Sequence, residues 1–158
     1  VLTACGSSVK LDEAAPIEDR TGSSSSADSR QVGMVDAVST DPLNDPKGEL
    51  AQRSVYFDFD SYVVKNEYQS VVDAHSRYLN SHRNRKVIIQ GNTDDRGGSE
   101  YNLALGQKRA EAVRKAMSLM GVSDDQMEAV SFGKEKPRAT GNNEAAWAEN
   151  RRADIVYQ

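Results

Sequence analysis

Two acidic side chains and one arginine have the types and the spacing to bind a ligand that carries both charges. Asp94 and Asp95 lie in a turn-rich segment, residues 92–98, and Arg109 follows Asp94 by fifteen positions. Carboxylates bind ammonium groups, and guanidinium groups bind carboxylates, through strong charge-assisted hydrogen bonds. A pocket with both groups therefore fits the head group of an amino acid. The alternative is a buried ion pair between Asp94 and Arg109 that only fixes the loop.

The position of Arg109 within a predicted helix is unusual. Apolar spacing predicts a helix over about residues 99–120, ended by Gly121. At about 100° per residue, Arg109 lies at the centre of the apolar stripe, and Asn102 lies about 20° from the same line. A buried arginine is costly unless its guanidinium is paired or reaches water. We therefore expect both side chains to face the acidic loop. The stripe contains Leu105, Val113, Ala116 and Met120, flanked by Ala112 and Met117.

The elements that must position these residues follow a β-α-β-α-β-(α)-β order. Alternation over residues 55–59 predicts a strand with Val55, Phe57 and Phe59 on one face. The other expected elements are a helix over 64–79, strands over 87–91 and 127–133, a short helix near 143–150 and a closing strand over 152–157. This order predicts the α+β class: a sandwich with helices packed on one face of a mixed four-stranded sheet.

Composition divides the 158-residue chain near residue 50. All ten aromatic residues follow this point, and residues 1–50 carry 4 basic and 9 acidic side chains, a net charge of −5, whereas the remainder carries +1. A segment with few apolar groups and excess like charge cannot offset its ordering entropy. We therefore expect a disordered acidic tether over residues 5–52 and one folded domain over residues 53–158.

The same composition excludes several classes of function. The net charge of −4 argues against nucleic acid as a partner, and no apolar run reaches the ~18–20 residues of a membrane-spanning helix. One cysteine excludes an intramolecular disulfide, and two histidines leave little for a zinc site. A calcium loop starting at Asn92 fails because Arg96 and Leu103 stand at ligand positions. We predict no metal and no cofactor.

The lone cysteine lies in the segment Leu2-Thr3-Ala4-Cys5. This segment resembles the end of a bacterial lipoprotein signal, in which small residues precede the cysteine that is lipidated. On this interpretation residues 1–4 are a remnant of the signal peptide and Cys5 carries the lipid. As a flexible coil, a tether of this length spans about 35–40 Å. The alternative is an incidental cysteine in a tail.

Several long motifs are shared with one family. The chain resembles the OmpA-like peptidoglycan-binding domain over essentially all of residues 53–158. The matching stretches are Val55-Tyr56-Phe57-Asp58-Phe59-Asp60, Gly91-Asn92-Thr93-Asp94-Asp95-Arg96-Gly97, Glu100-Tyr101-Asn102-Leu103-Ala104-Leu105-Gly106, Arg109-Ala110-Glu111-Ala112-Val113, Val130-Ser131-Phe132-Gly133-Lys134-Glu135-Lys136-Pro137 and Asn150-Arg151-Arg152-Ala153. One departure is Asn92, where family members that carry a lipid usually have histidine.

The resemblance implies non-covalent binding of the diaminopimelate in peptidoglycan stem peptides. Asp94 is then expected to accept hydrogen bonds from the ammonium, Arg109 to pair with the carboxylate, and Asn102 to complete the polar lining. The expected wall and rim are Phe57, Asp58, Thr93, Tyr101 and Leu105. The resemblance also implies a lipid anchor in the outer membrane, facing the periplasm, and partnership with TolB and other Tol proteins in envelope integrity and cell division.

An enzymatic alternative rests on two carboxylates at the ends of expected strands. Asp58 and Asp94 could act as a general acid and base on the glycan. No motif supplies the rest of a lytic enzyme, so we expect a binding protein without catalytic residues. Neither histidine has the partners of a nucleophilic triad: we expect His75 to be a hydrogen-bonded core residue and His82 to be solvated.

Overall fold

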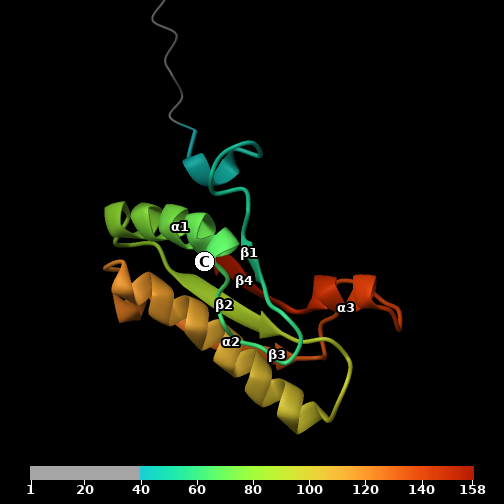
Figure 1. Ribbon diagram of the computed structural model, residues 1–158. Helices are drawn as coiled ribbons and strands as arrows, with labels where there is room; N and C mark the ends of the chain where they lie inside the picture. Colours follow the sequence, from blue (N-terminus) through green and yellow to red (C-terminus); the bar gives the residue numbers. More distant parts are fainter. Residues whose placement is uncertain (1–39) are drawn as a thin grey trace, which may run out of the picture. The chain divides into compact units, whose positions relative to one another are not determined.

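A computed structural model describes residues 40–158 of the chain (Figure 1). The expected lipidation at Cys5, the signal remnant over residues 1–4 and most of the expected tether lie outside the described residues. Within residues 40–158, no helix has the length and apolar character needed to cross a membrane.

The described residues form one mixed sheet of four strands in the order β1-β4-β2-β3. The strands are β1 (Ser54–Tyr56), β2 (Val87–Asn92), β3 (Met127–Gly133) and β4 (Arg152–Tyr157). Strand β4 is antiparallel to both β1 and β2, whereas β2 and β3 are parallel. The expected mixed four-stranded sheet is therefore confirmed, and with it the α+β class.

Two helices pack on one face of this sheet and bury the core with it (Figure 1). They are α1 (Gln69–Ser81), which follows the 3-10 turn η2 (Asn66–Tyr68), and α2 (Ser99–Leu119). Alternate strand residues such as Val87 and Ile89 meet the apolar stripes of the helices, which accounts for the periodicities in the sequence. Another 3-10 turn, η3 (Asp124–Gln126), precedes β3, and the short helix α3 (Glu144–Asn150) precedes β4.

Strand β1 is shorter than the expected strand over residues 55–59. It ends at Tyr56, and the N–H of Phe57 donates to the carbonyl oxygen of Arg151 at 2.8 Å. Phe57 and Phe59, expected on one face, consequently separate: Phe57 is 2% exposed and Phe59 is 61% exposed. This change directs Phe59 away from the core and toward the candidate site.

The segment before β1 packs against α1. It includes the 3-10 turn η1 (Pro42–Asn44), and the buried Leu50 contacts a cluster with Ala74 and Tyr78. Asp41 accepts hydrogen bonds from the Tyr78 hydroxyl at 3.0 Å and from Arg85 Nη2 at 2.5 Å. Packing on α1 therefore includes residues at least twelve positions before the expected domain boundary at residue 53.

Candidate functional site

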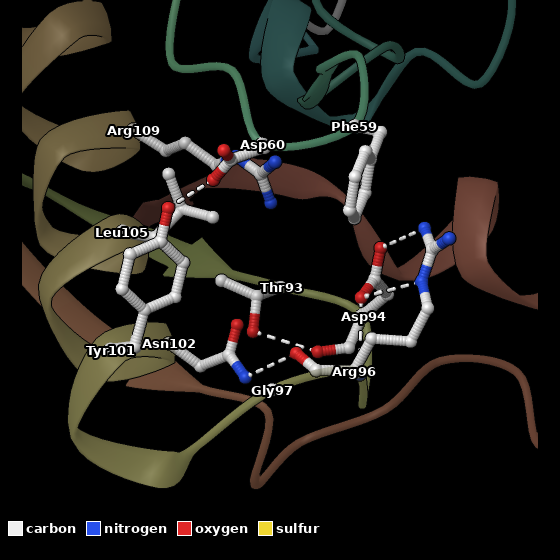
Figure 2. A pocket seen from close by; sticks show the side chains of 10 residues that line it. All are labelled: Phe59, Asp60, Thr93, Asp94, Arg96, Gly97, Tyr101, Asn102, Leu105 and Arg109. Carbon is white, nitrogen blue, oxygen red and sulfur yellow. Dashed lines mark hydrogen bonds and ion pairs between the residues drawn. The ribbon is translucent and has the colours of Figure 1, made fainter.

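A pocket of about 250 Å³ lies where the loop after β2 meets the N-terminal half of α2 (Figure 2). A third segment, the loop after β1, closes one side. Ten residues line it: Phe59, Asp60, Thr93, Asp94, Arg96, Gly97, Tyr101, Asn102, Leu105 and Arg109. The volume lies just below the ~300–1,000 Å³ of typical small-molecule sites. The pocket therefore has room for the end of a larger ligand rather than for the whole of one.

Arg109 is fully buried, as the position in the stripe predicted. Its guanidinium donates to backbone carbonyl oxygens of three residues: Ser61 at 2.8 Å, Asn92 at 2.9 Å and Asp58 at 3.1 Å. Within residues 40–158, no carboxylate forms an ion pair with this guanidinium. Burial lowers the pKa of Arg109 from 12.5 to about 10. Its positive charge is therefore held in place by dipoles and is not neutralised by an ion pair.

Asp94 and Arg109, expected to bind the two ends of one ligand, line the same pocket and have separate partners. Asp94 is 4% exposed, and its Oδ2 accepts from Arg96 Nη2 at 2.7 Å. Its Oδ1 accepts from the backbone N–H of Arg96 at 3.1 Å and from Nε at 3.3 Å. Arg151 Nη1 lies 3.6 Å from Oδ2. The alternative considered from the sequence, a direct ion pair between Asp94 and Arg109, is thus wrong for residues 40–158 of this structure.

The environment of Asp94 keeps its carboxylate ionised. Burial alone disfavours the charged form, but the hydrogen bonds from the side chain and backbone of Arg96 outweigh it. The positive charges of Arg96 and Arg151 act in the same direction, so the pKa of Asp94 lies below its ordinary value of 3.8. The site therefore presents a carboxylate and an uncompensated guanidinium on two different elements.

Arg96 closes one side of the pocket as the centre of an aromatic stack. Its guanidinium carbon lies 4.1 Å from the ring centroid of Phe59 and 4.0 Å from that of Trp147 in α3. The indole N–H of Trp147 donates to Asp95 Oδ1 at 2.7 Å. Three segments distant in sequence thus meet at Arg96, and the stack holds its guanidinium against Asp94.

The remaining polar groups of the pocket hold its loops in place. Asn102 Nδ2 donates to the carbonyl oxygen of Arg96 at 2.8 Å, and Thr93 Oγ1 donates to that of Asp94 at 3.0 Å (Figure 2). The Tyr101 hydroxyl donates to Asp60, whose φ of 52° is in the left-handed region. Asp and Asn tolerate this region better than most residues. Helix α2 is therefore tied to both loops that flank the pocket.

The structure brings together most of the residues predicted for the site. Those that line the pocket are Asp94, Arg109, Asn102, Thr93, Tyr101 and Leu105. Two others do not line it. Phe57 is buried, with its ring centroid 5.3 Å from the guanidinium carbon of Arg109. The Asp58 side chain is 70% exposed, and its Oδ1 lies 3.2 Å from Lys65 Nζ.

Sequence reasoning did not assign four lining residues: Phe59, Asp60, Arg96 and Gly97. All four stand inside the motifs quoted for the family resemblance, so that resemblance marked their segments without giving them a role. Arg151, whose role the sequence left open, lies behind Asp94 and donates through Nε to the carbonyl oxygen of Phe57 at 3.1 Å. Arg152 instead pairs with Asp154 at 2.9 Å, outside the pocket lining.

Comparisons with known proteins place this site in a family. Residues 56–151, which include the pocket loops and α2, match the model of the OmpA family. The chain belongs to the OmpA family. A protein named peptidoglycan-associated lipoprotein from Pasteurella multocida is 49% identical over 111 residues, which are 69% of this chain and 74% of the relative. A protein of the same name from Haemophilus influenzae is 48% identical, over 69% of this chain and 72% of the relative.

Two solved structures share the fold of this chain. The crystal structure of the peptidoglycan-associated lipoprotein from Burkholderia pseudomallei has 69% sequence identity and a TM-score of 0.74, covering 75% of this chain and all of that one. The C-terminal domain of Helicobacter pylori MotB has 19% identity and a TM-score of 0.63, covering 68% of this chain and 84% of that one. This second likeness concerns the fold alone.

Proposed function

We propose that this chain binds peptidoglycan non-covalently by holding the head group of diaminopimelate in the pocket. The ligand's ammonium faces Asp94, and its carboxylate faces Arg109. The names of the relatives from Pasteurella and Haemophilus support a peptidoglycan ligand. The pocket volume of about 250 Å³ supports the binding of the end of the diaminopimelate side chain rather than of a whole stem peptide.

One observation carries the proposal: Arg109 is 0% exposed, lines the pocket, and within residues 40–158 donates hydrogen bonds only to carbonyl oxygens. A buried cation without an ionic partner is costly, and a ligand carboxylate neutralises it. The resulting charge-assisted hydrogen bonds are the strong type, and a guanidinium can form two of them in parallel.

We propose a binding role and no catalysis. A general acid that cleaves a glycosidic bond needs a raised pKa, whereas the pKa of Asp94 is lowered. The other candidate, Asp58, points its carboxylate to solvent and pairs with Lys65. A release assay for soluble muropeptides checks this point. A binding protein liberates none, and their release would establish the lytic alternative.

We further propose that a lipid on Cys5 anchors the chain to the outer membrane on its periplasmic side, so that the domain holds this membrane to the cell wall. Partnership with TolB and other Tol proteins, in envelope integrity and cell division, belongs to the same proposal. In a precursor that carries a complete signal, Cys5→Ser is expected to move the protein from the membrane to the soluble periplasmic fraction. Unchanged membrane attachment would remove the anchor from the proposal.

Co-sedimentation with purified peptidoglycan tests the binding site. We expect Asp94→Ala and Arg109→Ala to abolish co-sedimentation, and Arg77→Ala, which removes an exposed arginine far from the pocket lining, to leave it unchanged. Because removing one member of a buried charge network costs about 3–5 kcal/mol of stability, circular dichroism must show that each variant is folded. Asp94→Asn and Arg109→Gln, which remove the charge and keep a polar side chain, serve where the alanine variants unfold. Folded variants that still sediment contradict the site.

A further inference from the structure

The carboxylate proposed to bind the ligand's ammonium already has a cation of its own chain. Both oxygens of Asp94 accept from Arg96, which contributes its backbone N–H, Nε and Nη2. Arg96 is not a deeply buried structural partner, since its side chain is 33% exposed against 6% for Asp94. An incoming ammonium must therefore replace or crowd a guanidinium that stands at the rim.

The aromatic stack determines where a displaced Arg96 can go. The rings of Phe59 and Trp147 lie on either side of the guanidinium, at 4.1 and 4.0 Å from its carbon. Stacking of this kind covers the two faces of the guanidinium and leaves the hydrogen-bonding edge free to change partners. Arg96 can thus leave the Asp94 carboxylate and still remain at the pocket lining.

A ligand that carries only an ammonium and a ligand that carries both an ammonium and a carboxylate have different effects on the ion pairs of the pocket. A ligand with only an ammonium pairs with Asp94 but leaves Arg96 without its carboxylate and leaves Arg109 without an ionic partner. A ligand with an ammonium and a carboxylate supplies an anion for the freed guanidinium and for Arg109. The ammonium then pairs with Asp94, and the ligand carboxylate is shared by Arg96 and Arg109, so that none of these three cations is left without an anion, which is the condition for favourable binding of buried ions.

We infer that Arg96 is a specificity-determining residue, which makes the pocket select a zwitterionic head group over a simple ammonium by exchanging ion-pair partners with the ligand. The selection rests on the proposed function, because it concerns the same ligand and pocket. It distinguishes stem peptides with diaminopimelate at the third position from stem peptides with lysine there, which lack the second carboxylate.

Titration calorimetry with two synthetic stem peptides tests the inference on the whole chain. The peptides are identical except for diaminopimelate or lysine at the third position. We expect the wild-type chain to prefer the diaminopimelate peptide, and Arg96→Gln to reduce the ratio of the two affinities by about tenfold, mainly because the lysine peptide binds more tightly. Arg96→Lys, which keeps a cation beside Asp94, is expected to retain most of the preference.

Arg77→Gln is the matched control, because it removes the same charge from an exposed arginine that pairs with Glu49 outside the pocket lining. It is expected to leave the affinity ratio at the wild-type value. An Arg96→Gln chain that folds and keeps the wild-type ratio overturns the inference while the proposed function stands. A wild-type chain that binds neither peptide removes the proposed function and the inference together.

A second measurement follows the wild-type pocket and uses a substitution only to assign one signal. The side-chain Nε–H resonance of Arg96 reports its hydrogen-bond partner, and Arg96→Lys assigns the signal by its loss. We expect saturation with the diaminopimelate peptide to shift this resonance, since its acceptor changes from Asp94 to the ligand carboxylate. A resonance that stays in place at saturation overturns the exchange of partners, even if the Arg96→Gln chain fails to fold.

Discussion

Gly91 of β2 and Gly106 of α2 lie in direct backbone contact. A Cβ atom on Gly91 would lie 1.8 Å from the Gly106 carbonyl oxygen, and one on Gly106 would lie 2.9 Å from the Gly91 oxygen. Both halves of the pocket start at this contact. Thr93 and Asp94 follow Gly91, whereas the helix residues of the pocket lie within five positions of Gly106. The pair of glycines therefore sets how closely the acidic loop approaches the arginine.

We expect Gly91→Ala to destabilise the domain by about 1–3 kcal/mol or more, because the added methyl overlaps backbone rather than a movable side chain. Peptidoglycan binding is expected to weaken in the same variant, since α2 must move away from β2. Urea unfolding and co-sedimentation measure the two effects.

Gly98→Ala is the matched control for this substitution, because a Cβ there meets no atom within 4 Å. Gly98 is also the N-cap residue of α2, where alanine is less favourable than glycine. Alanine reduces the conformational freedom of the unfolded chain, however, and this opposes the cost. We expect nearly unchanged stability. Equal effects of the two substitutions contradict the role of the close contact.

The inward position of Arg109 was predictable from the sequence, because the period of a helix fixes which side chains share a face. The same reasoning located α2 at Ser99–Leu119, against an expectation of about 99–120, and gave the burial of Asn102. These features follow from the spacing of apolar residues along the helix, which can be counted in the sequence without knowing the tertiary contacts.

The partners of Asp94 were not predictable in the same way. Arg96 is only two positions away, and its pairing depends on the rings of Phe59 and Trp147, which come from distant segments. Strand β1 shows the same limit. The hydrogen-bonded pairing of β1 with β4 ends at Arg152, the first residue of β4. The alternation of apolar residues through residue 59 therefore could not reveal where this pairing stops.

The pKa of Asp94 predicts how binding depends on acidity. Because the folded state lowers this pKa below 3.8, the carboxylate stays ionised, and its ion pairs keep contributing stability, at every pH above that value. The charge of the carboxylate and the stability from its ion pairs are both lost as the pH falls through the lowered pKa of Asp94 in the folded state. We expect co-sedimentation with peptidoglycan to be constant from pH 7 to about 5 and to decline only below about 4.

Circular dichroism at each pH is the control for this titration, because acid unfolding also ends binding. A decline in binding centred well above pH 4, with the domain still folded, contradicts the assignment of Asp94 as the ionised partner of the ligand.

Burial of His75 predicts a pH dependence of stability in a different range. The ring is 0% exposed, with Nδ1 2.7 Å from the Tyr157 hydroxyl and Nε2 2.8 Å from the Gln52 carbonyl oxygen. Burial lowers its pKa below 6.5, so the unfolded state binds more protons between the folded pKa and 6.5. Stability is therefore highest above pH 6.5 and falls below it, with a limiting slope of about 1.4 kcal/mol per pH unit from this group.

His75→Gln is expected to flatten the decrease in unfolding free energy between pH 6.5 and 5, measured by urea unfolding. His82→Gln is the comparison, because it makes the same substitution at an exposed histidine at the end of α1. A His75→Gln chain with the wild-type slope assigns the pH dependence to other groups.

The packing of residues 41–50 on α1 predicts where the domain can be truncated. A chain beginning at residue 40 keeps the buried Leu50 and the hydrogen bonds of Asp41, whereas a chain beginning at residue 53 loses both. Burying a leucine contributes about 1.5–3 kcal/mol and each net hydrogen bond about 1 kcal/mol. We therefore expect the shorter chain to unfold at lower urea concentration, with roughly 3.5–5 kcal/mol less stability.

Leu50→Ala in the longer chain separates the two contributions, because it removes the apolar contact with Ala74 and Tyr78 and keeps the hydrogen bonds of Asp41. We expect it to account for most of the difference, since leucine-to-alanine changes at buried sites cost about 2–5 kcal/mol. Equal stability of the two truncated chains would place the domain boundary at residue 53. A difference places the segment packed on α1 within the folded domain.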